Sequence, residues 1–131
     1  MPRLPPRYTA VRQLGAGGQA SVWLAADARA AGRQVAIKLL PEGSDGRALH
    51  REFALISRLR HPGLPAVYEL GLTGDRRPFL VAEYVAGLAL SAWQPTASPA
   101  ARVAAIARLL VIVDFLHRRG VVHRDLKPDN V

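Results

Sequence analysis

Residues 121–130 run Val121-Val122-His123-Arg124-Asp125-Leu126-Lys127-Pro128-Asp129-Asn130. After an apolar pair, this stretch offers a carboxylate that can act as a base (Asp125), a cation two positions later (Lys127) and a carboxamide five positions later (Asn130). As bare chemistry it could be a polar surface loop. The order and spacing of these groups after an apolar segment are much more specific than that, and they favour a loop built for chemistry.

A second group of residues lies far upstream, in Val35-Ala36-Ile37-Lys38. Strand alternation would place Ala36 and Lys38 on one face and Val35 and Ile37 on the other. A strand lysine usually faces solvent. Because this one follows a glycine-rich hairpin, the pattern instead favours a cleft in which a small residue forms a wall for adenine and a cation balances phosphate charge.

That hairpin holds glycines at positions 15, 17 and 18 between two predicted strands. Glycines allow backbone N–H groups to close over a phosphate chain without obstruction by side chains. The segment is not a dinucleotide fingerprint, because a strand pattern follows it where that fold requires a helix. It is not a P-loop either, because no Gly-Lys-Ser/Thr follows. A merely flexible hairpin remains the alternative.

Glu52 lies on the same side of a predicted helix as Leu49, Leu55, Ile56 and Leu59. We therefore expect a buried carboxylate within an apolar stripe, and a buried carboxylate needs a cationic partner. Lys38 is the natural candidate. The alternative is an edge residue whose side chain bends out to solvent.

Periodicity and turn signals predict an α+β fold with five strands and one helix in the first part of the chain. The strands are expected at residues 8–14, 20–26, 33–40, 66–72 and 78–84, and the helix at residues 47–60. Residues 91–97 are expected to be an irregular surface connection. A second helix should begin after the cap Ser98, with Pro99 at its first position, and run to about residue 119.

The second helix is apolar over much of its circumference, as in a helix buried in a larger body. Since few residues follow it, we expect the domain to continue past Val131.

Composition narrows the function classes. The chain has no cysteine, so disulfides, thiol catalysis and cysteine-rich zinc sites are excluded. The formal charge is +8, but the basic residues are scattered, which disfavours nucleic-acid binding. No run is long and apolar enough for a membrane segment and the start lacks a signal peptide, so we expect a cytoplasmic protein.

The basic residues are almost all arginine, and only Lys38 and Lys127 are lysine. Such a bias suggests a GC-rich genome, in which arginine replaces lysine wherever any solvated cation serves. A compact ammonium cannot be replaced by a planar guanidinium where geometry matters. Both lysines fall in the motifs described above, which supports a specific role for each.

In this order and spacing, the motifs resemble the eukaryotic-type serine/threonine protein kinase domain, in a form similar to bacterial members. The resemblance implies a five-stranded antiparallel N-lobe sheet with one crossing helix (residues 1–86), followed by the first helices and catalytic loop of an incomplete helical C-lobe (residues 87–131). It implies ATP and Mg²⁺ as cofactors and a protein with a Ser or Thr hydroxyl as substrate.

The resemblance also assigns ATP-contacting residues. The glycine-rich loop would supply Leu14, Gly15, Ala16, Gly17, Gly18, Gln19, Ala20, Ser21 and Val22, with Ala20 in place of the usual third glycine. Adenine would lie against Ala36 and Ala82 and bond to backbone groups of Glu83 and Val85. Ala82 occupies the gatekeeper position, which is usually bulkier, so an open pocket behind the adenine is implied.

For the chemistry, the resemblance implies that Lys38 contacts ATP and pairs with Glu52. Asp125 would be the catalytic base, Lys127 would steady the transferring phosphate, and Asn130 would bind the second magnesium ion. Lysine at 127 favours serine/threonine specificity over tyrosine specificity.

The family's D-F-G magnesium ligand, activation loop and A-P-E segment do not occur in these 131 residues. We therefore expect a fragment that is inactive alone. The alternative is a natural non-catalytic kinase-like protein that binds a nucleotide or a partner.

Overall fold

The computed structural model describes residues 1–18 and 20–131, so Gln19, one of the predicted ATP contacts, lies outside the described residues. The chain forms two compact units. The first contains residues 1–60 and 65–85, and the second contains residues 61–64 and 86–131.

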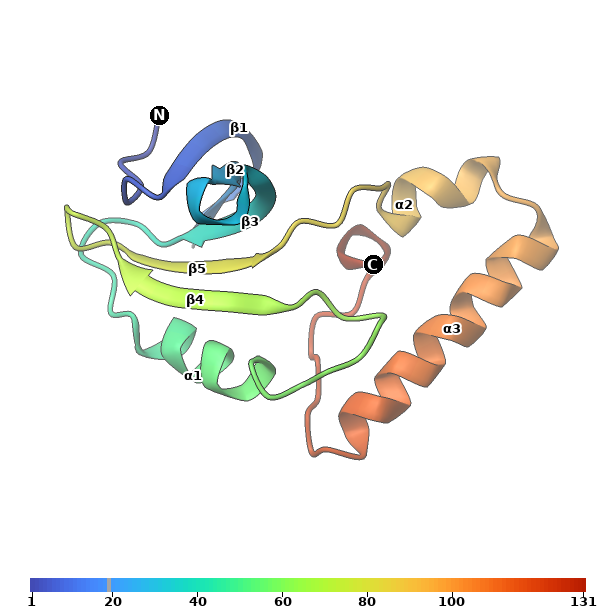
Figure 1. Ribbon diagram of the computed structural model, residues 1–131. Helices are drawn as coiled ribbons and strands as arrows, with labels where there is room; N and C mark the ends of the chain where they lie inside the picture. The colour runs from blue at the N-terminus through green and yellow to red at the C-terminus, as the bar shows by residue number, and fades with distance from the viewer. Residues whose placement is uncertain (19) are drawn as a thin grey trace. The chain divides into compact units, whose positions relative to one another are not determined.

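The first unit is built on an antiparallel five-stranded sheet with strand order β1-β2-β3-β5-β4 (Figure 1). The predicted five strands and the predicted α+β class are confirmed, and most strand boundaries agree within one residue. The strands are β1 (Tyr8–Gly17), β2 (Ala20–Asp27), β3 (Arg33–Leu39), β4 (Val67–Leu72) and β5 (Pro78–Glu83).

Between β2 and β3 the chain makes a short 3₁₀ helix, η1 (Ala28–Ala30), followed by two left-handed residues. Ala31 has φ +52° and Gly32 has φ +76°, so the glycine stands where a side chain would strain the turn. The chain turns back into β3 at these two residues.

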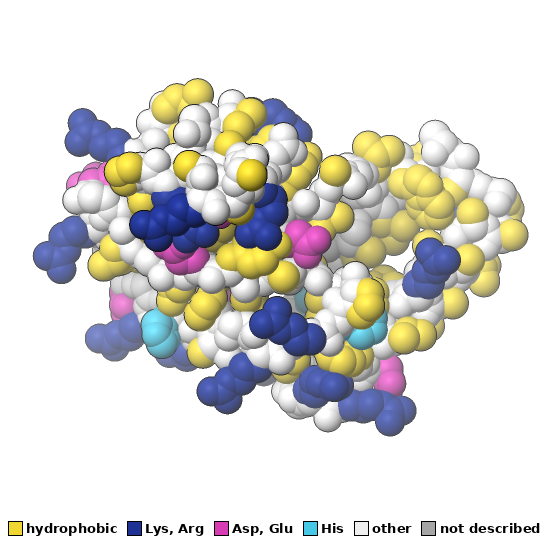
Figure 2. Space-filling view, viewed as in Figure 1, with side chains coloured by type: hydrophobic (Ala, Val, Ile, Leu, Met, Phe, Trp, Pro, Cys, Tyr) yellow, Lys and Arg dark blue, Asp and Glu magenta, His cyan; other side chains and the backbone are white. Residues whose placement is uncertain are grey.

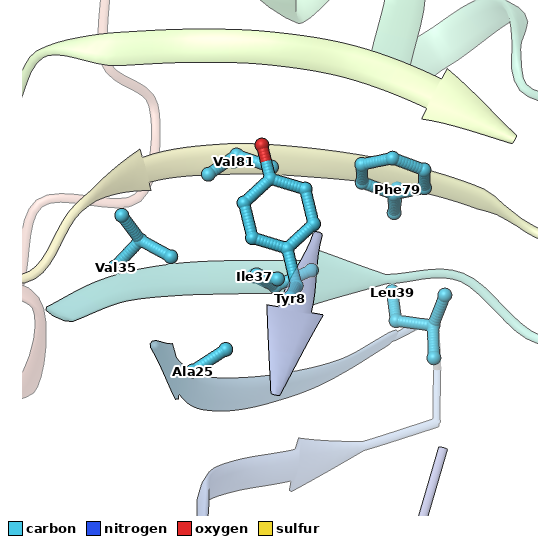
Figure 3. Close-up of a cluster of buried hydrophobic side chains, with 7 residues drawn as sticks. All are labelled: Tyr8, Ala25, Val35, Ile37, Leu39, Phe79 and Val81. Atoms are coloured by element: carbon cyan, nitrogen blue, oxygen red, sulfur yellow. The ribbon is translucent and has the colours of Figure 1, made fainter. Parts of the chain in front are cut away.

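Alternation along β3 separates the core from the opposite face. Val35, Ile37 and Leu39 are buried, whereas Ala36 and Lys38 are only half-buried. This is the predicted alternation, and it follows from the period-two geometry of a strand. The core cluster around β3 is apolar and spans four strands (Figure 3): Tyr8, Ala25, Val35, Ile37, Leu39, Phe79 and Val81.

Helix α1 (Arg47–Ile56) is four residues shorter than predicted. Its last α-type bond runs from the Ser57 N–H to the Phe53 carbonyl, and a turn then leads to His61. Of the predicted apolar stripe only Leu49 is fully buried, and Leu55 is 49% exposed. The apolar stripe is therefore only partly buried.

In the second unit, residues 91–97 were predicted to be irregular, but residues 91–96 are helical. They belong to helix α2 (Leu90–Trp93) and the 3₁₀ helix η2 (Gln94–Thr96). The Leu90 N–H at the start of α2 donates to the Val131 carbonyl at 2.8 Å. A four-residue helix has little intrinsic stability and depends on such distant contacts, which local sequence does not reveal.

Helix α3 (Pro99–His117) begins as predicted, with the Ser98 hydroxyl accepting a hydrogen bond from the Ala101 N–H at 3.2 Å. Several of its apolar side chains are exposed, including Val103 at 67% and Leu110 at 61%. Hydrophobic side chains accordingly cover much of the α3 part of the surface in Figure 2. Beyond α3 a turn at residues 118–120 leads into a loop that ends in the 3₁₀ helix η3 (Pro128–Asn130). None of the helices in the described ranges is long and apolar enough to cross a membrane.

Candidate active site

The predicted contact between Lys38 and Glu52 is present in the first unit. Lys38 Nζ donates to Glu52 Oε2 at 2.8 Å and to Oε1 at 3.1 Å. β3 carries the lysine and α1 carries the carboxylate, so the pair joins the helix to the sheet.

The pair is less buried than predicted. The Lys38 side chain is 36% exposed and the Glu52 side chain 41% exposed. An ion pair in contact with water contributes little to folding stability, because solvent screens both charges. The lysine ammonium is thus held in a defined position while remaining accessible to a ligand.

Two small residues lie beside Lys38 on the same face of the sheet. Ala36 in β3 pairs directly with Ala82 in β5, and both are half-buried. The next pair on this face of the sheet joins Lys38 to Leu80. Two opposed alanines leave the sheet surface flat next to the cation, which suits contact with a planar group.

At the end of β5, the two predicted adenine-binding residues differ in their backbone contacts. The Glu83 N–H donates to the Ala66 carbonyl at 2.7 Å, and the Glu83 carboxylate accepts from the Ala66 N–H at 3.0 Å. An adenine contact at Glu83 would therefore have to use its carbonyl. Val85 is 62% exposed, and within the described part of the chain no backbone hydrogen bond of Val85 to a loop or turn is found.

The glycine-rich segment is mostly strand. Gly15 pairs with Val22, Ala16 with Ser21 and Gly17 with Ala20, so the glycine-rich segment is part of the β1–β2 ladder up to Gly17. The pairing of β1 with β2 is shifted between Gln13 and Gly15, which leaves Leu14 out of the ladder. The sequence pattern instead predicted that residues 15–19 lie between the two strands.

Nothing in the described chain requires glycine at the hairpin. A Cβ atom built on Gly15 or Gly18 meets no atom within 4 Å, and one on Gly17 meets only the Ala20 carbonyl at 3.9 Å. By contrast, a Cβ on Gly71 would lie 2.8 Å from the Phe79 ring. Gly71 is thus explained by packing, whereas the hairpin glycines have no packing reason among the described residues.

In the second unit, the loop after α3 brings the predicted residues Asp125, Lys127 and Asn130 together. The Asn130 Nδ2 donates to both the carbonyl and the carboxylate Oδ2 of Asp125, each at 2.9 Å. Lys127 Nζ lies 3.8 Å from Asp125 Oδ1. All three residues are exposed, so this cluster is accessible.

The backbone of this loop is strained at Arg124, which has φ +65°. The left-handed region is costly for a residue with a side chain and tends to occur where function requires it. His123 Nδ1 accepts from the Asp125 N–H at 3.2 Å and so holds the turn around Arg124. Sequence reasoning did not predict this backbone conformation.

The loop also suits an oxygen-preferring metal ion. With its Nδ2 committed to Asp125, the Asn130 carboxamide keeps its oxygen available as a ligand. Mg²⁺ prefers carboxylate and carbonyl oxygens together with phosphate oxygens. Asn130 therefore fits the predicted metal-binding role.

Sequence reasoning missed one polar network in the first unit. Arg7 donates from Nε and Nη2 to the two carboxylate oxygens of Asp27, each at 2.8 Å, and from Nη1 to Glu69 Oε2 at 2.6 Å. The Tyr8 hydroxyl donates to the same Glu69 oxygen at 2.6 Å. No local pattern signals these contacts, because Glu69 is 62 residues from Arg7 in the sequence.

Among the pKa values that the network shifts are those of Asp27 and Tyr8. The hydrogen bonds from Arg7 hold the pKa of Asp27 below its ordinary value, although burial opposes this. Burial and the hydrogen bond to Glu69 raise the pKa of the Tyr8 hydroxyl above its ordinary value. Both groups therefore keep their usual neutral-pH forms, an ionised carboxylate and an un-ionised phenol.

Comparison with known proteins identifies the family. A family model described as the protein kinase domain matches residues 8–131. The chain is 35% identical to the serine/threonine-protein kinase Pkn1 of Myxococcus xanthus, covering 95% of this chain and 18% of that protein. It is also 35% identical to PrkC of Bacillus subtilis, covering 98% of this chain and 21% of that protein. The chain thus spans about a fifth of the length of these relatives.

Solved structures agree with the sequence relatives. The kinase domain of Mycobacterium tuberculosis PknI superposes with a TM-score of 0.74 and 27% sequence identity, covering 96% of this chain and 53% of that chain. This likeness confirms the predicted kinase-like fold. Together with the match over residues 8–131, it shows that this chain belongs to the protein kinase domain family, among relatives of the bacterial serine/threonine type.

Proposed function

We propose that this chain is the ATP-binding and catalytic-loop part of a serine/threonine protein kinase, which transfers the γ-phosphate of ATP to a protein hydroxyl. Residues 1–86 would form the ATP-binding lobe and residues 87–131 the start of the catalytic lobe. The observation that carries the proposal is the contact of Lys38 with Glu52 at 2.8 Å, which holds an accessible ammonium on the sheet face beside two alanines.

ATP binding is supported by how the first unit is built. The hairpin glycines have no packing reason among the described residues, as expected where backbone must approach a ligand closely. Lys38 would bind ATP phosphates, and Ala36 and Ala82 would contact the adenine ring. The Glu83 carbonyl and the Val85 backbone would supply the hydrogen bonds that orient it.

Phosphoryl transfer would use the loop of the second unit. Asp125 would accept the proton of the substrate hydroxyl, and Asn130 would orient the Asp125 carboxylate through its Nδ2 while offering its oxygen to the metal. Lys127, whose ammonium lies 3.8 Å from Asp125, would carry positive charge to the phosphoryl group. Magnesium-bound ATP would supply the transferable phosphoryl group and neutralise its charge.

The substrate class is inferred from the relatives and from one residue. Both relatives described above are named serine/threonine-protein kinases, and Lys127 fits that class. We therefore infer a protein Ser or Thr hydroxyl as acceptor. These 131 residues contain no D-F-G magnesium ligand, so they would bind ATP without useful turnover.

A binding titration tests the proposal. A fluorescent ATP analogue with Mg²⁺ is titrated into the wild-type chain, a Lys38→Met variant and an Arg47→Met control. Arg47 is an 83% exposed cation whose ion pair is with Asp45, so its loss removes the same charge elsewhere on the unit.

The wild-type and control chains should bind the analogue with equal affinity. Lys38→Met should bind it at least about tenfold more weakly, because a loss of about 1.4 kcal/mol of binding free energy suffices for that change. Equal affinity of Lys38→Met and wild type, with unchanged melting temperature, would place the ATP site elsewhere.

A further inference from the structure

The two edges of the first unit's sheet are joined by side chains. The strand order places β1 at one edge and β4 at the other. Nevertheless Tyr8, the first residue of β1, donates its hydroxyl to Glu69 in β4 at 2.6 Å. In Figure 3 the Tyr8 ring lies across the core over β3 and β5, with its hydroxyl directed toward β4. The sheet is therefore curled enough for a single side chain to link its edges.

Arg7 strengthens this link and ties it to β2. Its guanidinium holds both oxygens of Asp27, the last residue of β2, and also reaches Glu69. The Asp27 side chain is 1% exposed and the Arg7 side chain 27% exposed, so these charged hydrogen bonds are largely shielded from water. Bidentate arginine-carboxylate bonds fix orientation as well as distance. We refer to Arg7, Tyr8, Asp27 and Glu69 as the edge latch.

Strand β1 needs such support, because its pairing with the rest of the sheet is imperfect. It pairs only with β2, and that ladder is shifted twice, between Ala10 and Arg12 and between Gln13 and Gly15. Each shift leaves a residue unpaired and lets the strand bend. The edge latch holds the first end of β1, and the glycine-rich hairpin lies at the other end.

We propose that Glu69 is a positioning residue for nucleotide binding: by holding Arg7 and Tyr8 from the opposite edge of the sheet, it fixes β1 and thereby the hairpin over the ATP phosphates. Glu69 would not touch the nucleotide. The inference rests on the proposed ATP site for its effect on binding, but the effect on β1 is independent of that site.

The first experiment measures amide hydrogen exchange in the 131-residue chain without nucleotide. In Glu69→Leu, amides of residues 9–17 should exchange at least about tenfold faster than in wild type, as expected when local opening becomes easier, while β3 and β5 stay protected. Asp45→Asn, which removes an exposed ion pair of the same unit, should leave β1 unchanged. Unchanged exchange of β1 in Glu69→Leu would overturn the proposal, whether or not the chain binds ATP.

The second experiment compares ATP with adenosine, which lacks phosphates. Glu69→Leu should weaken ATP binding by at least about fivefold, the lower end of usual coupling between sites, and leave adenosine binding unchanged. Equal losses for both ligands would mean a general loss of folding, and no loss for ATP would mean that β1 does not position the hairpin; either result overturns the proposal. If wild type binds neither ligand, the proposed ATP site fails and the exchange result alone decides the role of the latch.

Milder variants guard against misfolding. Tyr8→Phe removes one hydroxyl from the latch, and Glu69→Gln keeps an oxygen that can accept a hydrogen bond. Both should lie between wild type and Glu69→Leu in β1 exchange and in ATP affinity. If Glu69→Leu is unfolded, Tyr8→Phe is compared with wild type in its place. Equal exchange rates of the β1 amides in Tyr8→Phe and wild type would then overturn the proposal.

Discussion

Lys38 Nζ lies 2.8 Å from Glu52 Oε2, and this contact joins β3 to α1 although the residues are 14 positions apart in the sequence. Both side chains remain more than a third exposed. The pair therefore defines where the ammonium sits more than it stabilises the fold. A lysine held in this way can contact an anionic ligand without losing its position.

Substitution of a hairpin glycine should weaken ATP binding without lowering the stability of the fold. Gly15→Ala adds a Cβ that meets nothing within 4 Å, at a residue without positive φ, so the free energy of unfolding should be unchanged or slightly higher. ATP binding should weaken, because the methyl group stands where backbone would approach the phosphates. Thermal unfolding and nucleotide titration measure the two effects.

Gly71→Ala is the matched control for that prediction. Its Cβ would lie 2.8 Å from the Phe79 ring, so this variant should be destabilised by about 1–3 kcal/mol, as usual for overpacking. A Gly15→Ala variant that binds ATP as wild type does would show that the hairpin glycines do not approach the phosphates.

Ala82 should control access for enlarged nucleotides. Ala82 is opposed by Ala36, so this cross-strand pair beside the proposed adenine site carries two small side chains. The wild-type chain should bind an ATP analogue with a benzyl group on N6 about as well as ATP, and Ala82→Met should reject the analogue while retaining ATP. Competition binding of the two nucleotides measures this preference. Equal rejection of the analogue by wild type would mean that no open pocket lies behind Ala82.

The 131-residue chain alone should show no phosphoryl transfer. Asp125, Lys127 and Asn130 are present, but the sequence contains no D-F-G magnesium ligand. Incubation with labelled ATP, Mg²⁺ and a generic serine/threonine substrate should give no more product than an Asp125→Asn control. Product above that control would mean that another residue replaces the D-F-G magnesium ligand. In a longer protein that includes the D-F-G segment, Asp125→Asn should abolish transfer.

Asp27 should make stability sensitive to acid. Its pKa lies below the ordinary value because Arg7 donates hydrogen bonds to its carboxylate. The ionised form thus stabilises the fold at pH above about 4, the ordinary aspartate value, and this contribution is lost as pH falls through the lower folded-state pKa. Asp27→Asn should be less stable than wild type at neutral pH. When the pH is lowered below about 4, its free energy of unfolding should fall less than that of wild type.

Urea unfolding at several pH values measures this difference. Asp45→Asn, which changes an exposed carboxylate, should follow the wild-type pH dependence. If Asp27→Asn loses stability in acid as steeply as wild type does, the acid sensitivity comes from other groups.

Several features follow from the sequence alone. Alternating apolar residues and turn signals predicted the five strands, because one buried face imposes a period of two. The alternation around Lys38 and the Ser98 cap were also predicted, since each depends on neighbouring residues. The order of the glycine hairpin, Lys38, Glu52 and the loop at Asp125 was sufficient to indicate the kinase family.

Only the tertiary structure decided the degree of burial and the long-range contacts. It showed that Glu52 and Leu55 are exposed to water, that α1 ends at Ile56, and that α2 forms where an irregular segment was expected. It also showed Tyr8 and Arg7 held by Glu69 across the sheet. These features depend on how strongly the sheet curls and on which distant segments meet. Local periodicity carries no information on either, because side chains brought together by folding are separated by tens of residues in the chain.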